Sequence, residues 1–120
     1  MGRVSTAIAV ETRSRGIRQV LSPVVNIADD VRWGRVEETY GEDPFLTGQL
    51  AVQFIRGLQG NDPKYLKTVA TVKHFAVHSG PEPERHVFDA VVSERDLRET
   101  YLPHFERGIR AAGAYSSMGA

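Results

Sequence analysis

The sequence contains no cysteine, and its Lys+Arg and Asp+Glu counts are both 15, so its formal net charge at pH 7 is zero. The absence of cysteine excludes disulfide bonds and thiolate metal ligands. The absence of a basic excess argues against nucleic acid and against an anionic membrane surface as partners, because both attract clustered positive charge. No apolar run approaches the ~20 residues that a membrane-spanning helix needs. We therefore expect neither nucleic acid nor a membrane as a partner.

The residues that are present have the composition of a globular domain. Hydrophobic residues make up 41% of the chain and charged residues 25%, which is usual for globular proteins. A length of 120 residues suits one small domain and is too short for two.

The most informative stretch is TVATVKHFAVHSG, residues 68–80. Its first part is apolar and β-branched, which predicts a strand buried on both faces, as in parallel sheets. The stretch turns polar at Lys73 and His74, and Gly80 with the prolines after it ends the strand. Because α/β folds place their sites at the carboxyl ends of strands, Lys73 and His74 are candidate site residues.

The amino-terminal third predicts a helix, a strand and a loop. Residues 4–18 have Val4, Ala7 and Ile8 at helical spacing, which predicts an inward face and a helix that frays at Gly16. The apolar run of residues 19–27 predicts a strand, which we start near residue 24 because Pro23 cannot donate a ladder hydrogen bond. Residues 28–40 have no clean period and predict a loop on the same side as Lys73 and His74.

The clearest helix begins after Asp43, which is a typical N-cap residue and is followed by Pro44 at the first helical position. The glycines at 57 and 60 are expected to end it. The apolar residues of this segment recur so that one face stays apolar over three turns. The residues expected to face inward are Leu46, Leu50, Ala51, Phe54, Ile55 and Leu58.

The last third predicts a short extended segment at residues 87–92, then a helix and a strand. Ser93 and Asp96 form a capping box at the helix start, Pro103 should kink or split the helix, and Gly113 closes it. Residues 114–120 have the pattern of a strand. The residues expected to face inward from the helix are Leu97, Tyr101, Leu102, Phe105 and Ile109. The alternation of helices and strands predicts an α/β fold with a parallel sheet.

Several motifs together resemble the amino-terminal domain of glycoside hydrolase family 3, which includes β-glucosidases and β-xylosidases. In chain order they are SPVVNIADDVRWGRVEETYGEDPFLTG, VKHFAVHSGPE, VSERDLRETYLPHFERG and SSMGA. The resemblance covers nearly the whole chain. It implies that residues 1–120 are a fragment of a (β/α)8 TIM-type barrel with about three β/α units, because a complete barrel usually needs ~250 residues.

The resemblance also implies a reaction, which is hydrolysis of a terminal β-linked sugar with retention of configuration. Two carboxylates ~5 Å apart carry out this reaction, and in this family they come from segments beyond residue 120. We therefore expect no catalytic residue and no cofactor in this chain. Its partners would be a small-molecule substrate (a β-glucoside, β-xyloside or short oligosaccharide) and the remainder of its own polypeptide. The alternatives are a stand-alone carbohydrate-binding or interaction module and an inactive truncated product.

Three residues match sugar-binding positions of the family by motif: Arg35 of RWGR, and Lys73 and His74 of KHF. Charged donors form strong hydrogen bonds to hydroxyl groups. Adjacent strand residues normally point to opposite faces, so Lys73 and His74 can share a ligand only if the backbone departs from strand geometry. The family has non-proline cis peptide bonds at this place, and the resemblance predicts one here.

Structural alternatives stay open for these residues. His74 could simply bind a backbone carbonyl, and Trp33 could either stack on a sugar or fill the core of its own loop. Arg35 could instead form an ion pair with one of three acidic neighbours: Glu37, Glu38 or Asp29. The remaining histidines do not have the spacing of a zinc site, so no metal is expected. These histidines are His78, His86 and His104.

Overall fold

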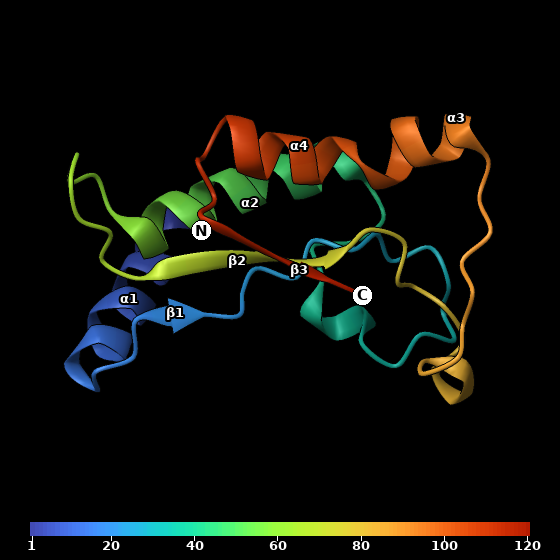
Figure 1. Ribbon diagram of the computed structural model, residues 1–120, viewed down its shortest axis with the longest axis horizontal. Coiled ribbons are helices and arrows are strands. Elements are labelled where there is room, and N and C mark those ends of the chain that lie inside the picture. The colour runs from blue at the N-terminus through green and yellow to red at the C-terminus, as the bar shows by residue number, and fades with distance from the viewer.

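The computed structural model describes residues 1–120, the whole chain. Its helices and strands alternate (Figure 1). The elements are α1 (Gly2–Ser14), β1 (Gln19–Val20), the 3-10 turn η1 (Val36–Glu38), α2 (Pro44–Gln59), β2 (Val69–Phe75), the 3-10 turn η2 (Glu82–Glu84), α3 (Glu94–Asp96), the π-helical turn η3 (Leu97–Tyr101), α4 (Pro103–Arg110) and β3 (Ser116–Gly119). The strands form one parallel sheet in the order β1–β2–β3. The predicted alternation and parallel sheet are confirmed.

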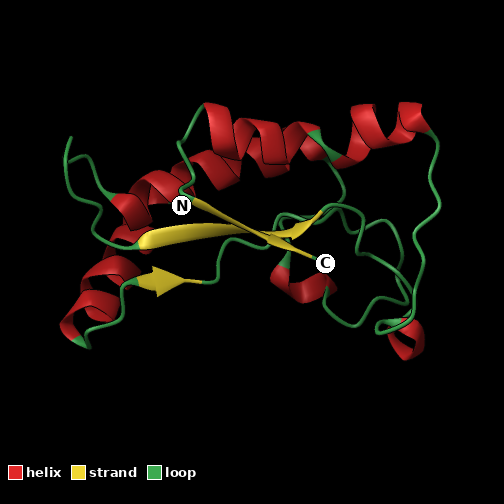
Figure 2. Cartoon of the chain, in the orientation of Figure 1, coloured by secondary structure: helices red, strands yellow, loops and turns green.

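The sheet is covered by helices on one face and surrounded by loops at one end. Helices α2 and α4 pack on each other and on β2, and α1 packs on α2. The long connections gather at the carboxyl end of β2 (Figure 2). This arrangement leaves the carboxyl ends of the strands facing loops, where side chains can reach a ligand.

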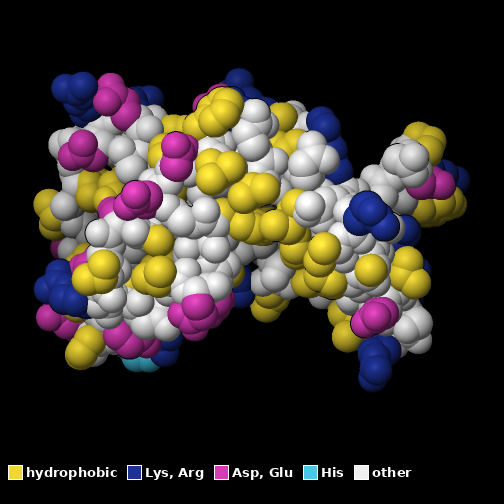
Figure 3. Space-filling model, turned by 180° about the vertical axis from the view of Figure 1, so that it is seen from behind, with side chains coloured by type: hydrophobic (Ala, Val, Ile, Leu, Met, Phe, Trp, Pro, Cys, Tyr) yellow, Lys and Arg dark blue, Asp and Glu magenta, His cyan; other side chains and the backbone are white.

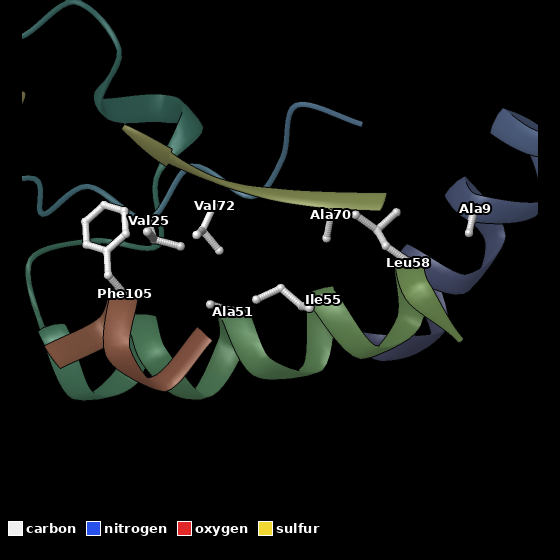
Figure 4. Packing of buried hydrophobic residues seen from close by; sticks show 8 residues of the cluster. All are labelled: Ala9, Val25, Ala51, Ile55, Leu58, Ala70, Val72 and Phe105. Atoms are coloured by element: carbon white, nitrogen blue, oxygen red, sulfur yellow. The ribbon is translucent and has the colours of Figure 1, made fainter. Parts of the chain in front are cut away.

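The hydrophobic core lies between α2, α4 and the sheet (Figure 4). Ile55 and Leu58 of α2 are 0% exposed and meet the apolar half of β2. The packing at Gly108 of α4 is tight, since a Cβ atom there would lie 3.3 Å from Ile55 Cδ1 and 3.3 Å from Val72 Cγ1. Complete burial of each large aliphatic side chain contributes about 1.5–3 kcal/mol, so this layer stabilises the packing of the helices on the sheet.

Helix α1 is present, but the prediction of its inner face is wrong. The buried residues are Ser5 and Ala9, whereas Val4 is 58% exposed and Ile8 is 36% exposed. The reason is the close approach of α1 to α2 at Gly57, where a Cβ atom would lie 1.9 Å from Ser5 Oγ. Only small side chains fit between two helix backbones at this separation, so the larger aliphatic residues of α1 face outward.

Strand β1 begins earlier than predicted, which corrects the expected start near residue 24. Regular pairing occurs at Gln19–Val20, and Val24 makes only an isolated bridge to Lys73. The ladder is irregular because Pro23 has no N–H group. Its carbonyl still accepts from Lys73 N at 3.2 Å, and Val25 N donates to Lys73 O at 2.9 Å, so the segment continues along β2 beyond the proline. The Ser22–Pro23 bond is cis.

Helix α2 confirms the predicted cap, and most of its predicted inner face is correct. Asp43 Oδ1 accepts a hydrogen bond from Leu46 N at 2.9 Å, and Gly60 with φ +76° follows the last turn. Leu46 itself is 50% exposed, contrary to prediction. The buried stripe instead includes Gly48, where an added Cβ atom would lie 3.5 Å from His104 Cα. Because α2 is flanked by α1, α4 and β2, it buries a wider surface than one face.

The last third follows the prediction at its caps and departs from it elsewhere. Ser93 Oγ accepts from Asp96 N at 3.0 Å, and the helix is split before Pro103, as expected. Phe105 is buried, but Ile109 is 44% exposed. The face that α4 buries consists of His104, Phe105 and Gly108, so its last buried position is Gly108, beside Ile55 and Val72, rather than Ile109.

Residues 87–92 form no strand, which corrects the expected extended segment. Val87 is 82% exposed and Val91 is 86% exposed, so this apolar run has no neighbouring strand with which to pair. Residues 114–120 do contain the predicted strand, β3, whose register places Thr71 opposite Ser116.

Several large apolar side chains remain on the surface. They include Val10 of α1, Leu21 after β1 and Tyr115 before β3, which are 55%, 49% and 76% exposed. Seen from behind, apolar side chains gather across the middle of the molecule (Figure 3). None of the helices combines the length and the apolar character needed to cross a lipid bilayer.

Candidate functional site

A hollow of about 470 Å³ lies at the carboxyl ends of β2 and β3. A larger hollow of about 630 Å³ lies between α2 and α4 on the outer helical layer, far from the strand ends. The smaller hollow is the candidate site, because α/β folds bind ligands at strand carboxyl ends and because two predicted site residues line it. Its lining residues are Arg35, His74, His78, Arg85, His86, Gly119 and Ala120.

His74 lies at the end of β2 and is only 6% exposed. Its backbone N donates to Asn26 Oδ1 at 2.7 Å, and its ring Nδ1 lies 3.1 Å from the same oxygen. Its Nε2 lies 3.1 Å from Arg35 Nη1. The ring of His78 packs beside it in a tilted arrangement, with the two centroids 4.6 Å apart. The histidine is thus held by a side-chain amide rather than by the backbone carbonyl of the structural alternative.

The pKa of His74 falls to about 4, first because the ring is buried and then because Arg35, His78 and Lys73 place positive charge nearby. His74 is therefore neutral at pH 7. Burial also lowers the pKa of Lys73, and the positive charge of Arg35 adds to that effect. The site concentrates cationic groups in a partly dry environment, which is the arrangement that shifts pKa values at functional sites.

Arg35 makes the ion pair foreseen as its structural alternative, and its partner is Glu38. Arg35 Nε donates to Glu38 Oε1 at 2.8 Å, and Nη2 donates to Oε2 at 2.7 Å. This bidentate bond raises the pKa of Arg35 and lowers the pKa of Glu38. The carboxylate is therefore committed to the guanidinium group, which it holds in one plane beside His74.

The structure brings the three predicted residues into one place. Arg35 reaches His74 directly, and Lys73 precedes His74 on β2, close enough that its charge acts on Glu38. The Lys73–His74 bond is cis, which confirms the predicted non-proline cis peptide, and the Phe75–Ala76 bond is cis as well. Whether these side chains bind sugar stays a prediction.

The loop that carries Arg35 is held by Glu82 of η2. Gly34 N donates to Glu82 Oε2 at 3.0 Å, and Glu82 N donates to Arg32 O at 3.1 Å. The other carboxylate oxygen of Glu82 pairs with Arg85 at 3.0 Å. A Cβ atom at Gly34 would lie 2.6 Å from Glu82 Cδ, so only glycine allows this close approach. Glu82 therefore joins the loop after β1 to the loop after β2.

Trp33 fills the core of its own loop, which decides between its two open alternatives. It is 2% exposed and lies edge-on to His78, with their ring centroids 5.9 Å apart. A ring with so little exposed surface cannot stack on a sugar. Trp33 instead supports the histidine that packs against His74.

Sequence reasoning missed two residues of the site, Asn26 and Glu82. Asn26 could have been found in the sequence, because it is a polar residue inside an apolar run. In the structure its side chain is buried, with 1% exposed. Glu82 had no signal of its own within its proline-rich loop. No three His, Cys, Asp or Glu side chains are arranged to hold a metal ion, and His104 is buried in α4 beside α2.

The fold and the candidate site define a class: a parallel α/β segment with a polar hollow at the carboxyl ends of its strands. Comparison with known proteins identifies the family. The model for the N-terminal domain of glycosyl hydrolase family 3 matches residues 1–120, and the chain belongs to this family.

Similar proteins agree with this assignment. A xylan 1,4-beta-xylosidase of Xylanibacter ruminicola is 53% identical over 84% of this chain and 12% of its own length. Beta-glucosidase B of Emericella nidulans is 42% identical over 98% of this chain and 13% of its own length. The structure of beta-glucosidase 3B from Thermotoga neapolitana in complex with glucose matches with a TM-score of 0.90 and 37% identity, over 99% of this chain and 16% of that one.

These matches confirm the predicted fold class, a partial α/β barrel with parallel strands. The chain spans about an eighth of the length of the Xylanibacter and Emericella relatives. Their names include both xylosidase and glucosidase activities.

Proposed function

We propose that this chain is part of a retaining, exo-acting β-glycosidase that hydrolyses terminal β-linked glucosides or xylosides. Residues 1–120 would be a fragment of its N-terminal barrel domain, supplying Arg35, Lys73 and His74 as sugar-binding residues. The nucleophile and the acid/base would come from other segments of the same polypeptide. One observation carries this proposal: Arg35 Nη1 lies 3.1 Å from His74 Nε2, in the hollow at the carboxyl ends of the strands.

The donor inventory of Arg35 suits a polyhydroxy ligand. A guanidinium group has five N–H donors, of which two bind Glu38 and one binds His74. Two donors therefore remain for hydroxyl groups. The ammonium group of Lys73 is part of none of the ion pairs in the structure. Bonds from charged donors to sugar hydroxyls are strong and can tighten as the sugar distorts toward the transition state.

The remainder of the polypeptide is the second proposed partner. The outer edges of β1 and β3 have no strand beside them, and unpaired edges invite further pairing. Exposed apolar residues such as Leu21 and Tyr115 lie next to these edges in sequence. Because the proposed nucleophile and acid/base belong to other segments, the isolated chain should show no hydrolysis.

The first test reads the gene for several hundred bases past the codon for Ala120, then expresses the whole reading frame. The product should hydrolyse a nitrophenyl β-glucoside or β-xyloside. Arg35→Ala and Lys73→Ala should each lower kcat/KM by roughly 10- to 100-fold, since a hydrogen bond to a charged group contributes about 1.5–3 kcal/mol. His74→Ala removes the acceptor that holds Arg35 Nη1 and should therefore lower kcat/KM as well. Arg95→Ala is the matched control, because that side chain is 81% exposed on α3.

Two outcomes would overturn the proposal. One is a full-length product that hydrolyses neither glycoside. The other is unchanged kcat/KM in all three site variants. If the frame ends at residue 120 and the chain binds glucose or xylose without hydrolysis, a stand-alone binding module replaces the enzyme.

A further inference from the structure

The geometry points to Asn26 as a positioning residue that fixes His74 with its ring proton on Nδ1, so that the Nε2 lone pair faces Arg35. Asn26 acts here through His74 and need not touch the substrate. The inference deepens the proposed function and rests on it only for the identity of the ligand.

The first step is the orientation of the Asn26 amide. Its Nδ2 lies 2.9 Å from His74 O and 3.1 Å from Ala76 O. Both neighbours are backbone carbonyls, which only accept, so the NH2 group must be on this side. The Oδ1 lies 2.7 Å from His74 N, which only donates. Two independent sets of contacts therefore place the amide in the same orientation.

The second step is the ring proton of His74. Asn26 Oδ1 can only accept, and it lies 3.1 Å from His74 Nδ1, so Nδ1 carries the proton. At the other end of the ring, Arg35 Nη1 can only donate to Nε2 at 3.1 Å. A neutral imidazole has one N–H group and one acceptor nitrogen, and both ends of the ring specify the same arrangement. Burial lowers the pKa of His74 to about 4, which keeps the ring neutral.

The third step is the effect on Arg35. Glu38 holds one edge of the guanidinium group, and His74 holds Nη1. With the ring proton on Nε2 instead, two N–H groups would face each other and the bond to Arg35 would be lost. The hydrogen bonds thus run in one direction, from Arg35 to His74, to Asn26 and to the carbonyl groups at the end of β2. Asn26 in this way fixes the two donors of Arg35 that remain for a ligand.

The test measures the ring nitrogens of His74 by 15N NMR, using the polypeptide that contains this chain labelled with 15N-histidine. The His74 signals are those that His74→Gln removes. In the parent protein Nδ1 should give the signal of a protonated nitrogen and Nε2 that of an unprotonated one. In Asn26→Leu, which has a similar size and no acceptor, only Arg35 still favours the proton on Nδ1. The signals of the two nitrogens should therefore move part of the way toward averaged positions.

The matched control is Gln59→Leu, which removes another buried amide. Gln59 is 5% exposed and binds the backbone of β2 and of the segment before β3. A purely structural effect would appear in both leucine variants, whereas the tautomer change should appear only at Asn26. A proton on Nε2 in the parent protein would overturn the inference, as would an unchanged tautomer in Asn26→Leu.

A sugar titration separates this inference from the proposed function. Adding glucose or xylose should shift the His74 Nε2 signal in the parent protein. A correct tautomer with no response to either sugar would contradict the proposed function alone. A shift on sugar binding together with the opposite tautomer would contradict the role of Asn26 alone.

Discussion

Two buried amides hold the two ends of β2, and they differ in what they bind. Gln59, near the amino end, accepts from Tyr115 N at 3.0 Å and donates to Gly113 O at 2.9 Å. Asn26, at the carboxyl end, binds backbone groups in the same way but also binds the ring of His74. The first amide joins strands, whereas the second also controls an ionisable side chain.

The difference shows how one short strand serves both stability and chemistry. Its amino half faces α2 through apolar residues, whose burial is favourable. Its carboxyl half carries Lys73 and His74, whose pKa values are lowered mainly by burial. Burying groups that can carry charge costs free energy. The favourable burial of apolar residues in the amino half of β2 must therefore offset the cost of burying Lys73 and His74 in its carboxyl half.

The largest expected effect comes from breaking the apolar half. Ile55→Ala should lower the free energy of unfolding by about 2–5 kcal/mol, because it removes a fully buried side chain and leaves a cavity. Urea denaturation measures the loss, and the His74 ring signals should stay unchanged. Val10→Ala, at a 55% exposed position on α1, should stay within about 0.5 kcal/mol. Equal losses in the two variants would contradict the assigned core.

A smaller effect is expected from the amide that binds only backbone. Gln59→Leu leaves Tyr115 N and Gly113 O without a partner, and the free energy of unfolding should fall by about 2 kcal/mol. Gln49→Leu is the control, because Gln49 lies exposed on the same helix. If both glutamine variants unfold at the same urea concentration, Gln59 does not tie the strands.

Acid should destabilise the fold through two buried histidines, His74 and His104, whose pKa values are lowered to about 4 from an ordinary value of 6.5, mainly by burial. Between these values the unfolded chain binds more protons than the folded one, so stability rises with pH across this window and is lost as pH falls from 6.5 toward 4. One such histidine contributes a slope of up to about 1.4 kcal/mol per pH unit.

His104→Leu should reduce this slope. The two ring nitrogens of His104 are buried without a partner, so the variant also removes unsatisfied polar atoms and should be at least as stable as the parent at pH 8. Denaturation curves at pH 5 and pH 8 measure both effects. A slope equal to that of the parent would show that His104 is not one of the acid-sensitive groups.

The smallest effect belongs to the surface. Glu99 pairs with Arg95 at 3.0 Å, but these side chains are 62% and 81% exposed. Glu99→Gln should change the free energy of unfolding by less than about 0.5 kcal/mol, because exposed ion pairs are weak and screened. The small difference in unfolding free energy between the parent and the variant at low salt should disappear at high salt. A loss similar to that of Gln59→Leu would mean that this pair between α3 and η3 contributes more than an exposed ion pair does.

The sequence by itself determined the caps, the order of the elements and the position of the polar strand end. Asp43 and Ser93 cap their helices as predicted, because capping depends on residues within one turn. The change from Val72 to Lys73 marked the site, because burying such side chains at a strand end costs free energy that only a partner or a ligand offsets. The motifs also pointed to Arg35, which lies beside His74 in the fold.

The tertiary structure alone decided which partner each of these groups has. Asn26 meets His74 across 48 positions of sequence, and Gln59 meets Tyr115 across 56. The close contact of Ser5 with Gly57 decided which face of α1 is buried. The spacing of apolar residues in α1 does not predict this contact. Local chemistry fixes caps and strand ends because the interacting atoms are neighbours in the chain. Amide partners and helix faces depend on the distances between elements, and folding sets these distances.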